Sequence, residues 1–148
     1  MIRILIVEDE SDIANAMKLN LDGREDIHVV GLAADGLQAV EMCRLYSPDL
    51  VLMDIQLPNM NGIEACCVIK RENPAIRVIF ITLFSDQKLI DAARNLKSNG
   101  YILKGRPAPV IINCIKQAML GLHVSDQVVA ERLRSEEHTS ELQSLSHL

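Results

Sequence analysis

Polar residues follow four strongly apolar runs of the sequence, at the point where each run ends. The runs cover 2–7, 50–53, 78–81 and 100–103, and the polar residues that follow them are Glu8 and Asp9, Asp54, Thr82 and Lys104. If the runs are parallel strands, their carboxyl ends meet at one edge of a sheet, where open α/β folds bind ligands. Carboxylates, a hydroxyl and an ammonium in one cleft suit a divalent cation and a phosphoryl group. The sequence therefore predicts a combined metal and phosphoryl site.

Asp54 is the candidate nucleophile of this site, because a carboxylate can attack phosphorus and form an acyl phosphate. A metal ion and Lys104 would neutralise the charge on the transferred group, and the Thr82 hydroxyl would bond another of its oxygens. Mg²⁺ or Mn²⁺ is the expected cofactor, since both prefer oxygen ligands. The expected metal ligands are the carboxylates of Glu8, Asp9 and Asp54 and the backbone carbonyl of Gln56.

Each of these residues also has an ordinary structural role when it is taken alone. An acid after a strand can cap the next helix, threonine is a frequent strand residue, and lysine is usually a surface charge. A magnesium-dependent phosphohydrolase is a second hypothesis, but it needs another acid in a D-x-D arrangement, and position 56 is Gln. A flavin- or nucleotide-binding protein is a third, but the turn at 8–10 is acidic and would repel phosphate. The order and spacing of the whole set favour a phosphoryl acceptor.

Strand-like and helix-like segments alternate five times, which is typical of a parallel sheet covered by helices on both faces. The expected strands are 2–7, 27–33, 50–54, 77–82 and 100–103. The first helix is expected to begin at an N-cap formed by Ser11 or Asp12, and the fourth to cover 89–96. The fifth should bury an apolar stripe made of Ile111, Cys114, Ile115, Ala118 and Leu122.

Composition bounds the class of protein. The 148 residues fit one domain, and 49% apolar with 24% charged residues is typical of a globular chain. A net charge of −5 counts against non-specific nucleic-acid binding by this segment. No apolar run reaches the ~20 residues of a membrane span, and a strand-like start in place of a signal peptide makes the cytoplasm the expected compartment. The cysteines, expected to be reduced thiols on helices, are Cys43, Cys66, Cys67 and Cys114.

The last part of the chain differs in character. Residues 124–133 are expected to form a short helix or a linker. From Arg134 onward the sequence is polar and lacks periodicity, and it resembles the translation of a sequencing adaptor; an ordinary disordered tail is the alternative. His138 and His147 are therefore not taken as metal ligands. The expected organisation is a domain over 1–121, the start of a linker or helix over 122–133, and a non-native or disordered tail over 134–148.

Four motifs strongly resemble the receiver domain of bacterial response regulators. They are VEDE at 7–10, LMDIQLPNMNG at 52–62, IT at 81–82 and GYILK at 100–104. The resemblance implies a flavodoxin-like (βα)5 fold with strand order 2-1-3-4-5, and a sensor histidine kinase that donates a phosphoryl group to Asp54. The residues that match the family's acidic pair, switch hydroxyl, switch aromatic and lysine are Glu8 and Asp9, Thr82, Tyr101 and Lys104.

Two departures refine this resemblance. Glu8 replaces the commoner aspartate, which affects the metal geometry, and Gly105 stands where many receivers carry proline. A lysine followed by glycine in place of proline resembles the NarL/LuxR-type subfamily. The stretch from 121 to 134 also resembles that subfamily's path into a linker and a helix-turn-helix domain. The chain is therefore expected to be truncated before a DNA-binding domain, with transcription regulated by the longer parent and homodimerisation on phosphorylation as a further option. A stand-alone receiver that acts by protein contact is the alternative.

The resemblance also implies a switch. Thr82 would move inward to bond the phosphoryl group, and Tyr101 would swing from an exposed to a buried position; a strand aromatic that never moves is the alternative. Gln56 and Phe84 should flank the phosphoryl group and tune its lifetime. No enzymatic activity is expected beyond self-catalysed phosphoryl transfer and slow autodephosphorylation.

Overall fold

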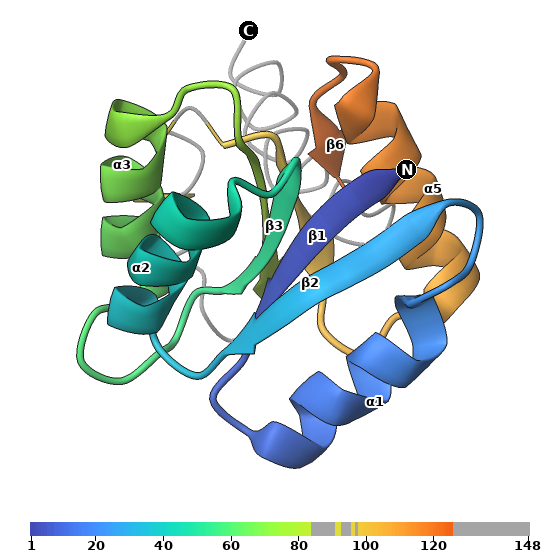
Figure 1. Cartoon of the computed structure of the whole chain (residues 1–148), viewed down its shortest axis with the longest axis horizontal. Coiled ribbons are helices and arrows are strands. Elements are labelled where there is room, and N and C mark those ends of the chain that lie inside the picture. The colour runs from blue at the N-terminus through green and yellow to red at the C-terminus, as the bar shows by residue number, and fades with distance from the viewer. Residues whose placement is uncertain (84–90, 93–95, 97, 126–148) are drawn as a thin grey trace, which may run out of the picture.

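The computed structural model describes residues 1–83, 91–92, 96 and 98–125. A six-stranded parallel sheet has the order β2-β1-β3-β4-β5-β6, with α2 and α3 on one face and α1 and α5 on the other (Figure 1). The strands are β1 (Ile2–Val7), β2 (Ile27–Ala33), β3 (Leu50–Asp54), β4 (Arg77–Thr82), β5 (Gly100–Leu103) and β6 (Val124–Ser125). The helices with bounds in the described residues are α1 (Ser11–Leu21), α2 (Gly36–Tyr46), α3 (Gly62–Glu72) and α5 (Ala108–Met119). The expected α/β fold class is confirmed, while most of the helix expected at 89–96 lies outside the described residues.

The sheet carries one strand more than expected. Val124 and Ser125, at the start of the segment expected to be a linker or helix, pair with Gly100 and Tyr101 of β5 in parallel register. The remainder of that segment and all of 134–148 lie outside the described residues. The chain that leaves α5 therefore returns to the sheet.

Strand register brings the ends of the central strands to one edge. Val7 pairs with Met53, Asp54 with Ile81, and Thr82 with Leu103. Every residue of β3 is buried, which explains its uniformly apolar sequence up to the aspartate. Residues at or just after the carboxyl ends of these strands therefore meet at the same edge of the sheet.

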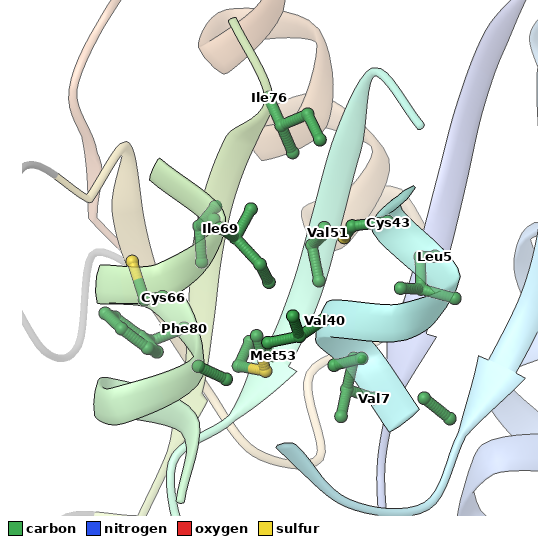
Figure 2. Packing of buried hydrophobic residues seen from close by; sticks show 14 of the residues in the cluster. Leu5, Val7, Val40, Cys43, Val51, Met53, Cys66, Ile69, Ile76 and Phe80 are labelled. Atoms are coloured by element: carbon green, nitrogen blue, oxygen red, sulfur yellow. The ribbon is translucent and has the colours of Figure 1, made fainter. Parts of the chain in front are cut away.

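Alternate strand residues fill two core clusters, one on each face of the sheet. The cluster on the α2 and α3 face includes Met53, Cys66, Ile69 and Phe80, whose side chains converge between the helices and the sheet (Figure 2). The opposite cluster lies against α1 and α5 and includes Ile4, Leu52 and Ile115. A sheet covered on both faces is rigid, and this holds the edge where the polar residues gather.

The N-terminal cap of α1 differs from the prediction. The helix begins at Ser11, its N-cap residue is Glu10, and no side chain caps it. The prediction of Ser11 or Asp12 as N-cap was therefore wrong by one or two positions. In contrast, Asp35 and Asn61 cap α2 and α3 with a side-chain oxygen that accepts a hydrogen bond from a backbone N–H.

The apolar stripe of α5 is confirmed except at its end. Ile111, Cys114, Ile115 and Ala118 are buried, but Leu122 is 54% exposed. The reason is that α5 stops at Met119 and the chain turns away at Gly121, where φ is +88°.

The four cysteines are free thiols, as expected. Three are buried and Cys67 is half-buried. Burial raises the pKa of the Cys43 and Cys66 thiols to about 12, so both stay protonated at neutral pH. In the described part of the chain, no helix combines the length and the apolar character needed to cross a bilayer.

Candidate phosphoryl and metal site

Two glycines allow the loop after β3 to fold tightly around the site. The Gly62 N–H donates to the carbonyl of Ile55 at 2.8 Å, and a Cβ on Gly62 would lie 2.1 Å from the carbonyl oxygen of Asp54. The Gly36 N–H likewise donates to the carbonyl of Met60 at 2.9 Å, where a Cβ would lie 2.2 Å from that oxygen. A side chain at either position would push the loop away, so both glycines are required by close backbone approach.

A side-chain hydrogen bond holds the same loop to the start of α2. Asn59 adopts a left-handed conformation with φ of +65°, and its Nδ2 donates to Asp35 Oδ2 at 2.7 Å. The second carboxylate oxygen of Asp35 caps α2 by accepting from the Gln38 N–H at 2.8 Å. The hydrogen bonds to Gln38 and then Asn59 lower the pKa of Asp35, which therefore stays ionised in this role.

Three carboxylates lie together at the strand ends. Oxygen atoms of Glu8, Asp9 and Asp54 all lie within 4.8 Å of one another. Glu8 and Asp54 are buried, at 3% and 5% exposure, whereas Asp9 is exposed. The structure therefore brings these three residues, from the ends of β1 and β3, together at this edge, as the sequence predicted.

Lys104 supplies the positive charge of the site. Its Nζ lies 2.9 Å from Asp54 Oδ2 and 3.2 Å from Glu8 Oε1. Its backbone N–H donates to the carbonyl of Thr82 at 2.7 Å, which extends the pairing of β4 and β5 by one residue. Burial alone would lower the pKa of Lys104, but the hydrogen bond and charge of Asp54, with the charge of Glu8, together raise it. The lysine is thus firmly cationic.

The environment of Glu8 is that of a carboxylate without enough positive partners. Burial, then a hydrogen bond that a protonated Glu8 shares with Asp54, and the charge of Asp54, raise the pKa of Glu8 to about 7. Its Oε2 accepts from the Asp9 N–H at 3.0 Å. Its Oε1 is buried and makes no hydrogen bond within the described residues, although Lys104 Nζ contacts it. A buried oxygen that shares one ammonium with Asp54, beside two further acids, fits a hard cation such as Mg²⁺.

Comparison with known proteins agrees with this geometry. The model of the response regulator receiver domain family matches residues 4–116. The chain belongs to this family. It is therefore a signalling module of the two-component type.

Individual relatives identify the subtype of this receiver. The response regulator protein VraR of Staphylococcus epidermidis strain RP62A is 32% identical over 134 residues, which cover 90% of this chain and 64% of VraR. The transcriptional regulatory protein LnrK of Bacillus subtilis strain 168 is 29% identical over 149 residues, covering all of this chain and 68% of LnrK. The crystal structure of a LuxR-family two-component response regulator from Aurantimonas sp. SI85-9A1 has a TM-score of 0.84 at 26% identity, covering 91% of this chain and 96% of that one. The predicted NarL/LuxR type is confirmed, and this receiver spans about two thirds of the length of the curated relatives.

The switch residues of the receiver have definite positions. Thr82 is buried, and its hydroxyl donates to the carbonyl of Leu83 at 3.2 Å rather than to Asp54. Tyr101 is already buried, at 7% exposure, beside Phe80 of the neighbouring strand. The exposed starting position expected for Tyr101 is not the one this structure shows.

Of the two residues expected to tune phosphoryl lifetime, only Gln56 is described. Its backbone N–H donates to Asp54 Oδ1 at 3.3 Å. Phe84 lies outside the described residues. The backbone carbonyl of Gln56 as a metal ligand stays a prediction.

Cavities open on both sides of Asp54 and Lys104 in the receiver. One, of about 580 Å³, is lined by Asp9, Gln56, Asn61 and Leu83 and leads to the carboxylates. The other, of about 380 Å³, lies between α1 and α5 and includes Ile13, Met17 and Ile111. Sequence analysis missed the second cavity and the Asp35–Asn59 link, because neither follows from the ends of the strands.

Proposed function

We propose that Asp54 accepts a phosphoryl group from a phosphohistidine of a sensor histidine kinase. The observation that carries this proposal is the contact of 2.9 Å between Lys104 Nζ and Asp54 Oδ2, beside two further carboxylates. Receiver domains of response regulators are phosphorylated by sensor kinases, which agrees with this chemistry. In the transfer, the phosphorus–nitrogen bond of the donor breaks, a bond forms between phosphorus and an Asp54 carboxylate oxygen, and the donor imidazole leaves.

Metal binding belongs to the same proposal. Glu8, Asp9 and Asp54, with the carbonyl of Gln56, would hold Mg²⁺ or Mn²⁺. When bound, the ion supplies positive charge that shields the oxygens of the transferred group. The raised pKa of Glu8, and its buried oxygen that shares the Lys104 ammonium with Asp54, support a site that gains from a cation.

Lys104 and Thr82 have distinct tasks. Lys104 contacts the Asp54 carboxylate before transfer and would then pair with a phosphoryl oxygen. The reason is that phosphorylation replaces the single negative charge of the carboxylate by about −1.5 to −2. The Thr82 hydroxyl must leave the carbonyl of Leu83 to bond another phosphoryl oxygen. This rotation is the first step of the proposed switch, and Tyr101 on the next strand is the proposed second residue.

The test uses acetyl phosphate and, separately, beryllofluoride, each with and without Mg²⁺. Wild type should gain one phosphoryl mass in acetyl phosphate and magnesium, and Asp54→Asn should gain none. Asp49→Asn is a matched control, because this acid bonds the Arg3 N–H at 2.8 Å and lies at the other end of β3. Modification that survives in Asp54→Asn, or that is lost equally in Asp49→Asn, would contradict the proposal.

The output of the parent protein is a separate proposal. The name of LnrK describes a transcriptional regulatory protein, and the chain spans about two thirds of its length. We propose that a full-length protein of this kind regulates transcription through a C-terminal DNA-binding domain, with homodimerisation as the step that phosphorylation favours. Sequencing of the gene beyond the codon of Leu133 tests this, because a stop codon there would favour a stand-alone receiver acting by protein contact.

A further inference from the structure

The chain that leaves α5 is attached to the strand that carries the proposed switch aromatic. β6 pairs with the first two residues of β5, Gly100 with Val124 and Tyr101 with Ser125. β5, α5 and β6 thus form a complete strand–helix–strand unit. Whatever follows Ser125 in the chain starts from the edge of the sheet.

Gly100 allows β6 to lie close to β5. Its φ is +149°, and a Cβ on it would lie 2.0 Å from the carbonyl oxygen of Val124. The side chain of Val124 is 2% exposed and belongs to the core cluster on the α5 face. The approach of β6 is therefore a packed contact that any side chain at position 100 would prevent.

Asn99 fixes the position of β6 relative to the rest of the sheet. Its carbonyl accepts from the Val124 N–H at 2.9 Å. Its Oδ1 accepts from the Val78 N–H at 2.9 Å and from Lys70 Nζ at 2.7 Å. Arg77 adds a second tie, because its Nε donates to the carbonyl of Ala118 in the last turn of α5 at 2.9 Å.

The residue before β6 contacts Tyr101 directly. The rings of His123 and Tyr101 meet edge to face, with centroids 5.8 Å apart and planes at 73°. On the other side of Tyr101, its register neighbour on β4 is the fully buried Phe80. A movement of Tyr101 away from His123 would remove this ring contact.

We infer that His123, Val124 and Ser125 form an exit strap whose pairing with β5 is coupled to the position of Tyr101. With Tyr101 buried, His123 is held and the strap is closed. Outward movement of Tyr101 removes the ring contact, and the two-residue strand then opens more often by local unfolding. This goes beyond the proposed phosphorylation of Asp54 and does not require it.

The coupling is measurable in the unphosphorylated protein. The sequence contains no tryptophan and two tyrosines, so Tyr46→Phe leaves Tyr101 as the sole fluorophore of this type. In that background, His123→Ala should increase acrylamide quenching of Tyr101. Loss of an edge-to-face contact of this kind should shift the equilibrium between the closed and the open exit strap about two- to tenfold. Amide exchange at Val124 should accelerate by the same factor. Leu122→Ala, at an exposed neighbouring position, should change neither quantity.

The reverse experiment is decisive, because an energetic coupling between two sites acts equally in both directions. Tyr101→Ala should accelerate Val124 exchange by a similar factor, Tyr101→Phe should leave it near wild type, and the double variant Tyr101→Ala/His123→Ala should add nothing further. Amides of Leu5 and Ile6, both fully buried in β1, report global unfolding. Val51→Ala, which weakens the core on the Tyr101 face, should change exchange at all of these sites together.

Two outcomes would overturn the exit strap. One is unchanged Val124 exchange in Tyr101→Ala while the β1 amides keep their protection. The other is an additive effect in the double variant. A beryllofluoride arm separates this inference from the proposed function. Failure of beryllofluoride to bind Asp54 would contradict phosphorylation, whereas binding without any change at Val124 or Tyr101 would show that the strap does not respond to the site.

Discussion

The ammonium of Lys104 lies 2.9 Å from the Asp54 carboxylate, and in the same position it reaches Glu8 at 3.2 Å. One cation from the end of β5 thus compensates two buried acids from β1 and β3. Removal of one partner from a buried ion pair leaves an uncompensated charge, which is costly. The relationship implies that charge balance at this site depends on Lys104 until a metal ion or a phosphoryl group changes it.

Lys104→Met should lower the rate of Asp54 modification by acetyl phosphate on the order of 10²-fold, because one donor to the developing charge is lost. The measurement is the initial rate by intact-protein mass spectrometry at saturating Mg²⁺. Lys18→Met, at an exposed lysine of α1, removes the same charge elsewhere and should react like wild type. Equal rates in both variants would show that Lys104 has no part in transfer.

Mg²⁺ should stabilise the protein against urea. At ten times its dissociation constant, a ligand specific for the folded state adds about 1.4 kcal/mol to the free energy of unfolding. Asp9→Asn and Asp54→Asn should each need more Mg²⁺ for the same gain. Asp26→Asn, on the loop before β2, should behave as wild type. A magnesium response that is identical in all four proteins would place the ion elsewhere.

Glu8 should make the metal-free protein less stable as pH rises from about 4.5 to 7. The pKa of Glu8 is raised from 4.5 to about 7 in the folded state, so the folded protein binds more protons than the unfolded chain in this range. The stability from protonated Glu8 is fully present below 4.5 and lost as pH rises through about 7.

The measurement is the difference in unfolding free energy between wild type and Glu8→Gln in EDTA. The unfolding free energy of wild type relative to Glu8→Gln should fall by at most on the order of 3 kcal/mol between pH 4.5 and 8. Groups that titrate identically in both proteins cancel in it. A difference that is flat with pH would mean that Glu8 ionises normally in the folded protein.

Gly62→Ala should destabilise the protein by about 1–3 kcal/mol and weaken its magnesium response. The added Cβ would meet the Asp54 carbonyl at 2.1 Å, so the loop that carries Gln56 must move. Gly31→Ala is the matched control, because the three atoms nearest its Cβ would all belong to side chains, and the closest would be the flexible end of Met42 at 3.2 Å. Urea unfolding with and without Mg²⁺ compares the two, and equal behaviour would contradict the tight approach at Gly62.

Phe84→Ala should shorten the half-life of the acyl phosphate, because a bulky apolar side chain two residues after Thr82 is expected to hinder attacking water. The half-life is followed in magnesium buffer after removal of the donor. Leu37→Ala, at an exposed position on α2, should leave it unchanged. An unchanged half-life in Phe84→Ala would refute its expected role.

Much of the site was predictable from the sequence, for a physical reason. A strand buried on both faces must be uniformly apolar, so the runs that end at Glu8, Asp54 and Lys104 were visible as strands. Parallel strands end at a common edge, and this made the meeting of those residues predictable before any distance was known. The motif at 52–62 and the lysine after 100–103 pointed to the family by their resemblance to its motifs.

Tertiary structure decided the quantities that depend on atoms distant in the chain. The pKa of Glu8 follows from its desolvation and from Asp54 and Lys104, and no local pattern contains these distances. The cap of α1, the burial of Tyr101 and the end of the α5 stripe before Leu122 were likewise settled by packing and chain direction. β6 is the clearest case, because two residues carry no periodicity. Their place in the sheet depends on Gly100 and Asn99, which only the folded chain brings against them.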